Sequence, residues 1–323
     1  MVICARNEKE HLLLKVPEIL AQDYPDFQLV LVDDCSSDGT WEVMKAFEKK
    51  DERVKLVQVN EHDQFYTSKK YALTLGIKAA KHDLLVFTDA DCRPNTKTWL
   101  QEMSNGMQSK EVLLAYGDYE AKTGFLNALI RFDAFLIASQ YAALARKGIV
   151  YMGVGRNMAY RKDLFLRNRG FSKHQHIDSG DDDLFIGAVA KPKLTAINMS
   201  AEAKTWSEPK TTILEWIRQK GRHLTTFKHY GLKNKVFVGS LSLAQLVALT
   251  LGILFLMSPY FLLCIILLSL KALLLSAVML KLRKEHSLPG FVLIPLIWEL
   301  FLYAMYPVFF ISSKTYKKGT WKI

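Results

Sequence analysis

Apolar and polar residues alternate along the first 90 residues in a pattern that predicts strands and helices in turn. Short apolar runs predict buried strands at residues 2–5, 28–32, 54–59 and 84–88. The segments between them carry apolar residues at helical spacing and predict helices at residues 8–21, 40–49 and 68–80. Because strands that alternate with helices at this spacing form parallel sheets, we expect an α/β domain with a mostly parallel sheet flanked by helices.

The pattern is less regular beyond Pro94, where two longer helical segments stand out. Residues 124–145 form an amphipathic stretch, which predicts either a core helix or a helix lying at a membrane surface. Residues 211–230 predict a second helix, rich in Arg, Lys, His and Trp.

Three apolar stretches follow, at residues 236–257, 260–280 and 288–312. Each is long enough to cross the roughly 30 Å apolar core of a bilayer. The third contains Glu299 and three prolines, and an acid at membrane depth usually faces protein or water. We therefore expect two to three membrane spans.

The charge distribution also favours a membrane protein. The 323 residues carry a formal net charge of +11, and 50% of them are hydrophobic. Basic residues flank the apolar stretches, at 228–235, 281–284 and 314–322, where membrane lipids are the expected partners. The sequence has no basic stripe with interleaved aromatic residues, which is the pattern that would indicate nucleic-acid binding. The first two basic groups favour the cytoplasmic side, so a third full crossing would place the tail outside unless that segment is re-entrant or interfacial.

The cysteines and the N-terminus add little chemistry. The four cysteines form no CxxC pair, which favours free thiols over a disulfide framework or a zinc site. No signal peptide is expected, because a strand begins almost at Met1. We expect either that the start site is placed late or that residues are missing upstream.

Acidic residues follow two of the predicted strands. Asp33 and Asp34 end the second strand, and Asp89 and Asp91 end the fourth. Ligands of open parallel sheets bind beyond the carboxyl ends of the strands, so these acids mark the expected site. Two carboxylates separated by one residue can converge on a hard divalent cation that bridges phosphates. The alternatives are a strand-to-helix connection for the first pair and a solvated acidic turn for the second.

Three later motifs carry further candidate chemistry. The aspartates in SGDDDL (179–184) either favour a helix N-terminus or include a general base whose proton affinity is raised by its neighbours. In QKGRH (219–223), Gln219 and Arg222 share one helical face on which Arg can bind a diphosphate, and a basic helix beside the membrane is the alternative. The glycines of GVGRNMAYR (153–161) permit close backbone approach to a ligand, without the spacing of the dinucleotide fingerprint.

In this order the motifs resemble the large family 2 of inverting glycosyltransferases, which have the GT-A fold. The matching pieces are ICARNE (3–8), DDCSSDGT (33–40), TDAD (88–91), GRN (155–157), GDDD (180–183) and QKGRH (219–223). The resemblance covers roughly residues 1–230, and the apolar tail resembles that of membrane-bound members. His223 stands where the family's Q-x-x-R-W motif has Trp, which argues against processive polymer synthesis.

The resemblance implies roles for the matching residues. The Asp33-Asp34 strand end would hold the base and ribose of the donor, and Asp89 and Asp91 would bind its diphosphate through Mg²⁺ or Mn²⁺. Asp182 is the preferred catalytic base, and a different alignment of the aspartate run gives Asp181. The implied donor-binding residues are Ala5, Asn7, Glu8, Asp33, Asp34, Lys69, Asp89, Gln219 and Arg222, and the implied acceptor-binding residues are Gly155, Arg156, Asn157 and His223.

The resemblance also implies the reaction. We expect a GT-A domain at 1–205, juxtamembrane helices at 206–235 and a membrane region at 236–323. The expected activity is inverting transfer from a nucleotide diphosphate sugar, with UDP preferred, to a hydroxyl of a lipid-linked or polysaccharide acceptor. The expected place is the cytoplasmic face of a bacterial inner membrane. The alternatives are a polyprenyl-phosphate sugar synthase and a non-catalytic membrane subunit that retains donor binding.

Overall fold

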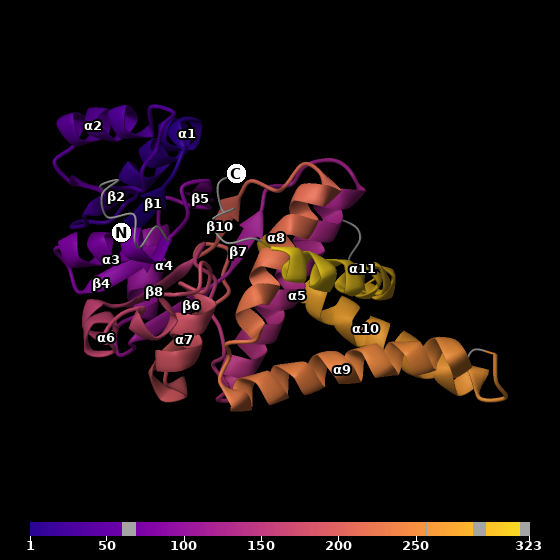
Figure 1. Cartoon of the computed structure of the whole chain (residues 1–323). Helices are drawn as coiled ribbons and strands as arrows, with labels where there is room; N and C mark the ends of the chain where they lie inside the picture. The colour runs from indigo at the N-terminus through magenta and orange to yellow at the C-terminus, as the bar shows by residue number, and fades with distance from the viewer. Residues whose placement is uncertain (60–68, 256, 287–294, 317–323) are drawn as a thin grey trace. The chain divides into compact units, whose positions relative to one another are not determined.

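The computed structural model describes residues 1–59, 69–255, 257–286 and 295–316. These residues form two compact units (Figure 1). The first consists of Met1–Glu120 and Ala134–Pro209, and the second of Ala121–Asp133 and Lys210–Tyr316.

A seven-stranded sheet with the order β3-β2-β1-β4-β8-β6-β9 forms the centre of the first unit. β1, β2, β3 and β4 run parallel, β8 is antiparallel to both of its neighbours, and β9 is parallel to β6. The prediction of a mostly parallel sheet flanked by helices is confirmed. The strands are β1 (Val2–Ala5), β2 (Leu29–Asp33), β3 (Val54–Gln58), β4 (Leu84–Phe87), β6 (Val112–Ala115), β8 (Met158–Arg161) and β9 (Thr195–Asn198).

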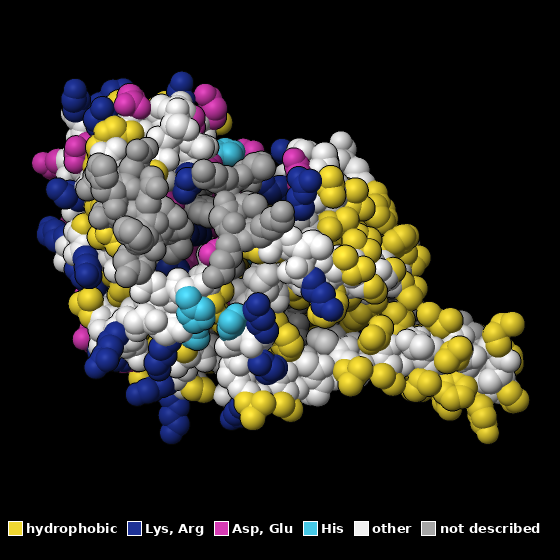
Figure 2. Space-filling view, in the orientation of Figure 1, with side chains coloured by type: hydrophobic (Ala, Val, Ile, Leu, Met, Phe, Trp, Pro, Cys, Tyr) yellow, Lys and Arg dark blue, Asp and Glu magenta, His cyan; other side chains and the backbone are white. Residues whose placement is uncertain are grey.

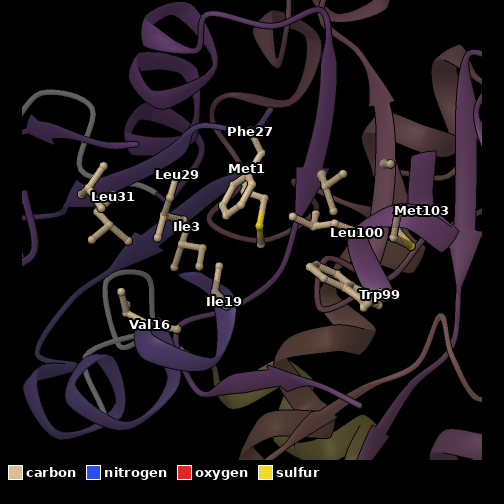
Figure 3. Close-up of a cluster of buried hydrophobic side chains, with 14 of the residues drawn as sticks. Met1, Ile3, Val16, Ile19, Phe27, Leu29, Leu31, Trp99, Leu100 and Met103 are labelled. Atoms are coloured by element: carbon tan, nitrogen blue, oxygen red, sulfur yellow. The ribbon is translucent and has the colours of Figure 1, made fainter. Parts of the chain in front are cut away.

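Side chains that alternate along the central strands pack against helices on both faces of the sheet. On one face, Ile3 and Leu31 join a buried cluster with α1 (Lys9–Leu20), α2 (Thr40–Lys50) and α4 (Trp99–Gly106), shown in Figure 3. On the other face lies α3 (Lys69–Ala79). A Cβ at Gly76 of α3 would lie 2.6 Å from a methyl of Val32 and 2.8 Å from one of Val2, so α3 approaches the sheet closely. This contact sets where Lys69 and Lys70, in the first turn of α3, lie relative to the carboxyl ends of the strands.

Aromatic rings attach the later helices of the first unit to the sheet. Phe87 of β4 stacks on Tyr160 of β8, with ring centroids 4.3 Å apart. The ring centroids of Tyr160 and Phe185 are 5.1 Å apart, and Phe171 packs edge-on against both Phe165 and Phe185. Phe165 belongs to α6 (Lys162–Arg167), Phe171 to the turn after it, and Phe185 to α7 (Asp183–Val189). They hold the start of α7, and with it the aspartate run, against the sheet.

A second, three-stranded sheet has the order β5-β10-β7. Its strands are β5 (Cys92–Pro94), β7 (Gly117–Tyr119) and β10 (Thr205–Ser207). Each has three residues, too few for an apolar alternation to be recognised in the sequence.

The second unit is helical in the residues described. It contains the first part of α5 (Phe125–Arg146), then α8 (Ile213–Phe227), α9 (Leu232–Phe255), α10 (Phe261–His286) and α11 (Pro295–Thr315). Helix α8 begins with a capping box between Thr212 and Glu215, and its Trp216 packs edge-on against Phe309 of α11. Glu299 of α11 is buried and accepts a hydrogen bond from Lys271 of α10 at 2.6 Å.

By length and composition, three of the described helices could cross a membrane: Phe125–Arg146, Leu232–Phe255 and Phe261–Val278. The apolar window of the first is 61% buried in protein, against 11% and 6% for the other two. The first therefore behaves as a core helix, whereas α9 and α10 expose apolar side chains, which gather over α9 in Figure 2. The predicted stretch 288–312 lies partly outside the described residues, and its described part belongs to α11.

Candidate active site

The Asp89-Ala90-Asp91 motif forms a tight turn between β4 and β5. The backbone N–H of Cys92 closes this turn on the carbonyl of Asp89 at 3.1 Å. Ligand atoms of Asp89, Asp91 and Cys92 consequently all lie within 4.8 Å of one another. Burial, and next the charge of Asp89, raise the pKa of Asp91 to about 6. Carboxylates held this close repel each other, so the turn suits a divalent cation with oxygen ligands.

Cys92 supports this turn through its thiol. Its Sγ lies 3.3 Å from Oδ1 of Asp91 and 2.9 Å from Oγ of Ser207. Burial raises the pKa of the Cys92 thiol well above its usual range. The protonated thiol therefore donates to Asp91, and the oxygen ligands available to a hard cation are those of Asp89 and Asp91.

Lys69 connects this turn to the later aspartate run. Its Nζ donates to Oδ1 of Asp89 at 2.7 Å and lies 3.4 Å from Oδ2 of Asp181. Asp89 and Asp181 come from distant parts of the sequence, and one ammonium group offsets the repulsion between them. A small cavity lies here, lined in part by Lys69, Asp89, Gly155 and Asp181.

Asp182 is held at the N-terminus of α7 by two backbone N–H groups. Its Oδ2 accepts from Gly155 at 2.8 Å and its Oδ1 from Asp183 at 2.7 Å. Burial is the largest cause that raises the pKa of Asp182 to about 7, followed by the charges of Asp181 and Asp183. A carboxyl group that titrates near neutral pH is suited to general base catalysis.

Asp33 and Asp34 lie where β1 and β2 end side by side, with Ala5 paired to Asp33 in the parallel register. Both aspartates are 1% exposed, and burial raises the pKa of each. Among the described residues, Oδ1 of Asp33 and Oδ2 of Asp34 have no hydrogen-bond partner, although Nη1 of Arg6 lies 3.8 Å from the latter. Buried acceptors without donors are costly, so this strand end suits a ligand that supplies donor groups.

The loop after β1 is tied to the loop after β2. Asn7 adopts a left-handed conformation with φ of 57°, and its Oδ1 accepts from the backbone N–H of Ser37 at 2.8 Å. The N–H of Glu8 donates to Oγ1 of Thr40 at 2.9 Å, and the Glu8 carboxylate makes a short hydrogen bond to His11. That hydrogen bond is the largest cause that raises the pKa of His11 to about 9.

Arg156 lies beside the Asp89–Asp91 turn. Its guanidinium carbon is 4.1 Å from the centre of the Tyr119 ring, and Nη1 donates to Oγ of Ser207 at 3.3 Å. Its backbone carbonyl accepts from Oγ1 of Thr88 at 2.9 Å, which fixes the Gly155-Arg156 segment against the end of β4.

Asn157, which was expected to contact the acceptor, is buried and hydrogen-bonded within the protein. Its side chain has no exposed surface, its Nδ2 donates to the carbonyls of Tyr116 and Ala203, and its Oδ1 accepts from Nε1 of Trp99. All of these partners belong to the protein, so these hydrogen bonds fix the segment that contains Gly155 and Arg156, and contact of Asn157 with the acceptor stays a prediction.

Gln219, Arg222 and His223 lie on α8 in the second unit. The two residues between Gln219 and Arg222 have packing roles. Lys220 donates to Asp133 at 2.7 Å, and a Cβ on Gly221 would come within 2.4 Å of Oγ of Ser312 in α11. Contact of Gln219, Arg222 or His223 with the donor or acceptor stays a prediction.

Several residues in or next to the site were not predicted from the sequence. Cys92 directly follows the Asp89–Asp91 motif and had a positional signal, whereas Tyr119 and Ser207 lie on three-residue strands without one. Lys70 also had a signal, because it shares the buried helical face of Leu73 and Ile77.

A family model described as Glycosyl transferase family 2 matches residues 1–168. The chain is 31% identical over 85 residues to the putative teichuronic acid biosynthesis glycosyltransferase TuaG of Bacillus subtilis, a match that covers 26% of this chain and 32% of TuaG. It is 25% identical over 126 residues to the UDP-Glc:alpha-D-GlcNAc-diphosphoundecaprenol beta-1,3-glucosyltransferase WfaP of Escherichia coli, which covers 39% of this chain and 47% of WfaP.

Among solved structures, the mannosyltransferase PcManGT of Pyrobaculum calidifontis, in complex with GDP-Man and Mn²⁺, is similar with a TM-score of 0.59. The sequences are 17% identical, and the alignment covers 97% of this chain and 85% of PcManGT. This likeness confirms the expected GT-A fold. The chain spans between 32% and 51% of the length of the curated relatives TuaG, WfaP and AglE of Haloferax volcanii.

The buried hydrogen bonds of Asn157 predict a stability defect when its side chain is removed. Asn157→Ala leaves the indole of Trp99 and two buried carbonyls without partners, which should lower the free energy of unfolding by about 2–4 kcal/mol. Asn168→Ala is the matched control, because it removes one hydrogen bond from a half-buried asparagine and should cost less than about 1.5 kcal/mol. Urea unfolding of the full chain in detergent, followed by tryptophan fluorescence, measures both. Equal stability of the two variants would contradict the structural role of these hydrogen bonds.

Proposed function

The chain belongs to glycosyl transferase family 2, and from this premise we propose that it transfers a sugar from a nucleoside diphosphate donor to an acceptor hydroxyl with inversion at the anomeric carbon. The observation that carries the proposal is the meeting of two acidic elements at one edge of the sheet. Through Lys69, the Asp89–Asp91 turn lies beside the aspartate run that contains Asp182.

Donor binding is assigned to the ends of β1, β2 and β4. The unpartnered oxygens of Asp33 and Asp34 suit hydrogen-bond donors on the nucleoside, namely base N–H groups and ribose hydroxyls. Asp89 and Asp91 fit a divalent cation, Mg²⁺ or Mn²⁺, which when bound would neutralise the diphosphate that leaves. UDP is the preferred nucleotide, because the relative WfaP is named for UDP-Glc.

The chemical step is assigned to Asp182. Its carboxylate takes the proton of the acceptor hydroxyl while the oxygen forms a bond to the anomeric carbon. The bond from that carbon to the diphosphate breaks in the same displacement, and its electron pair leaves with the nucleoside diphosphate. The two N–H groups that hold the Asp182 carboxylate fix its direction, and its buried environment keeps its proton affinity high enough for this transfer.

The acceptor is proposed to be lipid-linked or a growing polysaccharide at the cytoplasmic face of a bacterial inner membrane. Helices α9 and α10 have the length, composition and exposed apolar surface of membrane spans. The relatives WfaP and TuaG carry names that refer to a diphosphoundecaprenol-linked sugar and to teichuronic acid. Gly155 and Arg156, on the segment that borders the Asp89–Asp91 turn, are proposed to face the acceptor, and Gln219, Arg222 and His223 of α8 are proposed to complete the site.

A polyprenyl-phosphate sugar synthase is the second candidate. Its acceptor is a phosphate, which needs little help from a base, so the raised proton affinity of Asp182 favours a hydroxyl acceptor. Mass spectrometry of the glycosylated lipid separates the two candidates. A non-catalytic subunit is disfavoured, because the acidic residues that catalysis requires are present and come together.

Asp91→Asn should abolish metal-dependent turnover. The change removes one of the two carboxylate ligands, and loss of several kcal/mol of charge stabilisation corresponds to a rate lowered by more than about 100-fold. The measurement is release of nucleoside diphosphate from a nucleotide sugar with Mn²⁺. Asp163→Asn, which changes an exposed aspartate paired with Arg167, is the control and should act like wild type. Wild-type turnover by the Asp91→Asn variant would contradict the metal assignment.

The pH dependence of kcat/KM should reflect the protonation state of Asp182. At saturating Mn²⁺, kcat/KM should rise about tenfold per pH unit below 7 and level off above it, because the base acts only when deprotonated. Asp182→Asn should lower the rate by about 10²–10⁴-fold. Asp181→Asn should keep activity and move the inflection to lower pH, because the charge of Asp181 helps to raise the pKa of Asp182. If Asp181→Asn is the inactive variant and Asp182→Asn keeps the rate, Asp181 is the base.

A further inference from the structure

Lys70 is a buried cation in the first turn of α3. It is 1% exposed, and its Nζ donates to the carbonyls of His174, Ile177 and Ser179 at 2.8, 2.9 and 2.6 Å. An ammonium group has three N–H donors, so these three carbonyls saturate it. None of the assigned donor, metal or acceptor contacts uses this side chain.

The three carbonyls come from the segment that leads into the aspartate run. Residues 174–179 wrap around one ammonium group, and the chain then turns at Gly180, whose φ is +91°, into Asp181 and Asp182. Beyond this point Asp182 caps the N-terminus of α7, which the aromatic rings hold against the sheet. The segment before Asp182 is thus fixed by Lys70 and the segment after it by packing.

Lys69 and Lys70 have different hydrogen-bond partners. Lys69 contacts the carboxylates of Asp89 and Asp181, whereas the hydrogen bonds of the Lys70 ammonium group to described residues go to backbone carbonyls in the loop before the aspartate run. Burial lowers the pKa of Lys70, although the nearby charges of Asp181, Asp183, Asp182 and Asp178 act to raise it. A neutral apolar side chain would fill the same position on the helix face of Leu73 and Ile77 at lower desolvation cost, so the carbonyl contacts are the feature that an ammonium group adds.

We propose that Lys70 is a positioning residue for catalysis, which holds the 174–179 segment so that Asp182 is presented to the acceptor hydroxyl. The inference rests on the proposed function, in which Asp182 is the base. Since a displacement of about 1 Å in a reacting group costs on the order of 100-fold in rate, loss of the three hydrogen bonds should act mainly on the chemical step.

The test compares Lys70→Met with Lys162→Met in the full chain. Lys162 also donates to backbone carbonyls, those of Lys78 and Ala80 at the other end of α3, at 3.1 and 2.7 Å. Both variants therefore remove a lysine that bonds main-chain carbonyls around the same helix, and only the first touches the segment before Asp182.

Lys70→Met should lower kcat by about 10- to 100-fold with the KM for the donor changed less than about twofold. Lys162→Met should keep the wild-type kcat. Hydrogen–deuterium exchange provides a second measurement that needs no activity: amides in residues 174–183 should exchange at least about tenfold faster in Lys70→Met and at the wild-type rate in Lys162→Met.

The outcomes distinguish failure of the positioning role of Lys70 from failure of the proposed function. A kcat of Lys70→Met within twofold of wild type, or a loss matched by Lys162→Met, overturns the positioning role. Unchanged exchange at residues 174–183 in Lys70→Met also overturns it. If the wild-type chain turns over no nucleotide sugar, the proposed function fails, while the exchange comparison still decides whether Lys70 holds this segment.

Discussion

The contact on which the rest of the site depends is the one that Lys69 makes with Asp89 and Asp181. Acidic residues from two distant parts of the chain meet at the carboxyl edge of the sheet, where they would otherwise repel each other. The close approach of α3 to β1 and β2 at Gly76 sets the position of that ammonium group. A packing contact between a helix and a sheet thus places the ammonium group that lies between Asp89 and Asp181.

The two acidic elements have different surroundings, and their chemistry follows from this difference. Asp89 and Asp91 are brought together by a tight turn and share their negative charge, which suits a cation. Asp182 is held by two backbone N–H groups beside two further aspartates, which suits a group that gains and loses a proton near neutral pH. Residues of one type therefore serve two proposed roles because their environments differ.

The sequence predicted the first half of the fold well, because β1 to β4 and α1 to α3 carry clear periodicity and end in turn residues. It also pointed to the right strand ends, since Asp33-Asp34 and Asp89–Asp91 follow buried apolar runs. It could not show that Lys69 contacts Asp89 and Asp181, because that depends on how closely α3 packs. It could not show the hydrogen bond between Asn157 and Trp99 for a related reason: a polar residue inside a motif gives no sign of which buried group its amide faces.

The most direct measurement is metal-dependent release of nucleoside diphosphate by the purified full chain, compared with its Lys69→Met variant across a set of nucleotide sugars. The account predicts that wild-type protein turns over at least one donor with Mn²⁺ or Mg²⁺, that a chelator stops the reaction, and that Lys69→Met lowers the rate by more than about 100-fold. Turnover by Lys69→Met at the wild-type rate, or no turnover of any nucleotide sugar by the wild-type chain, would contradict the account.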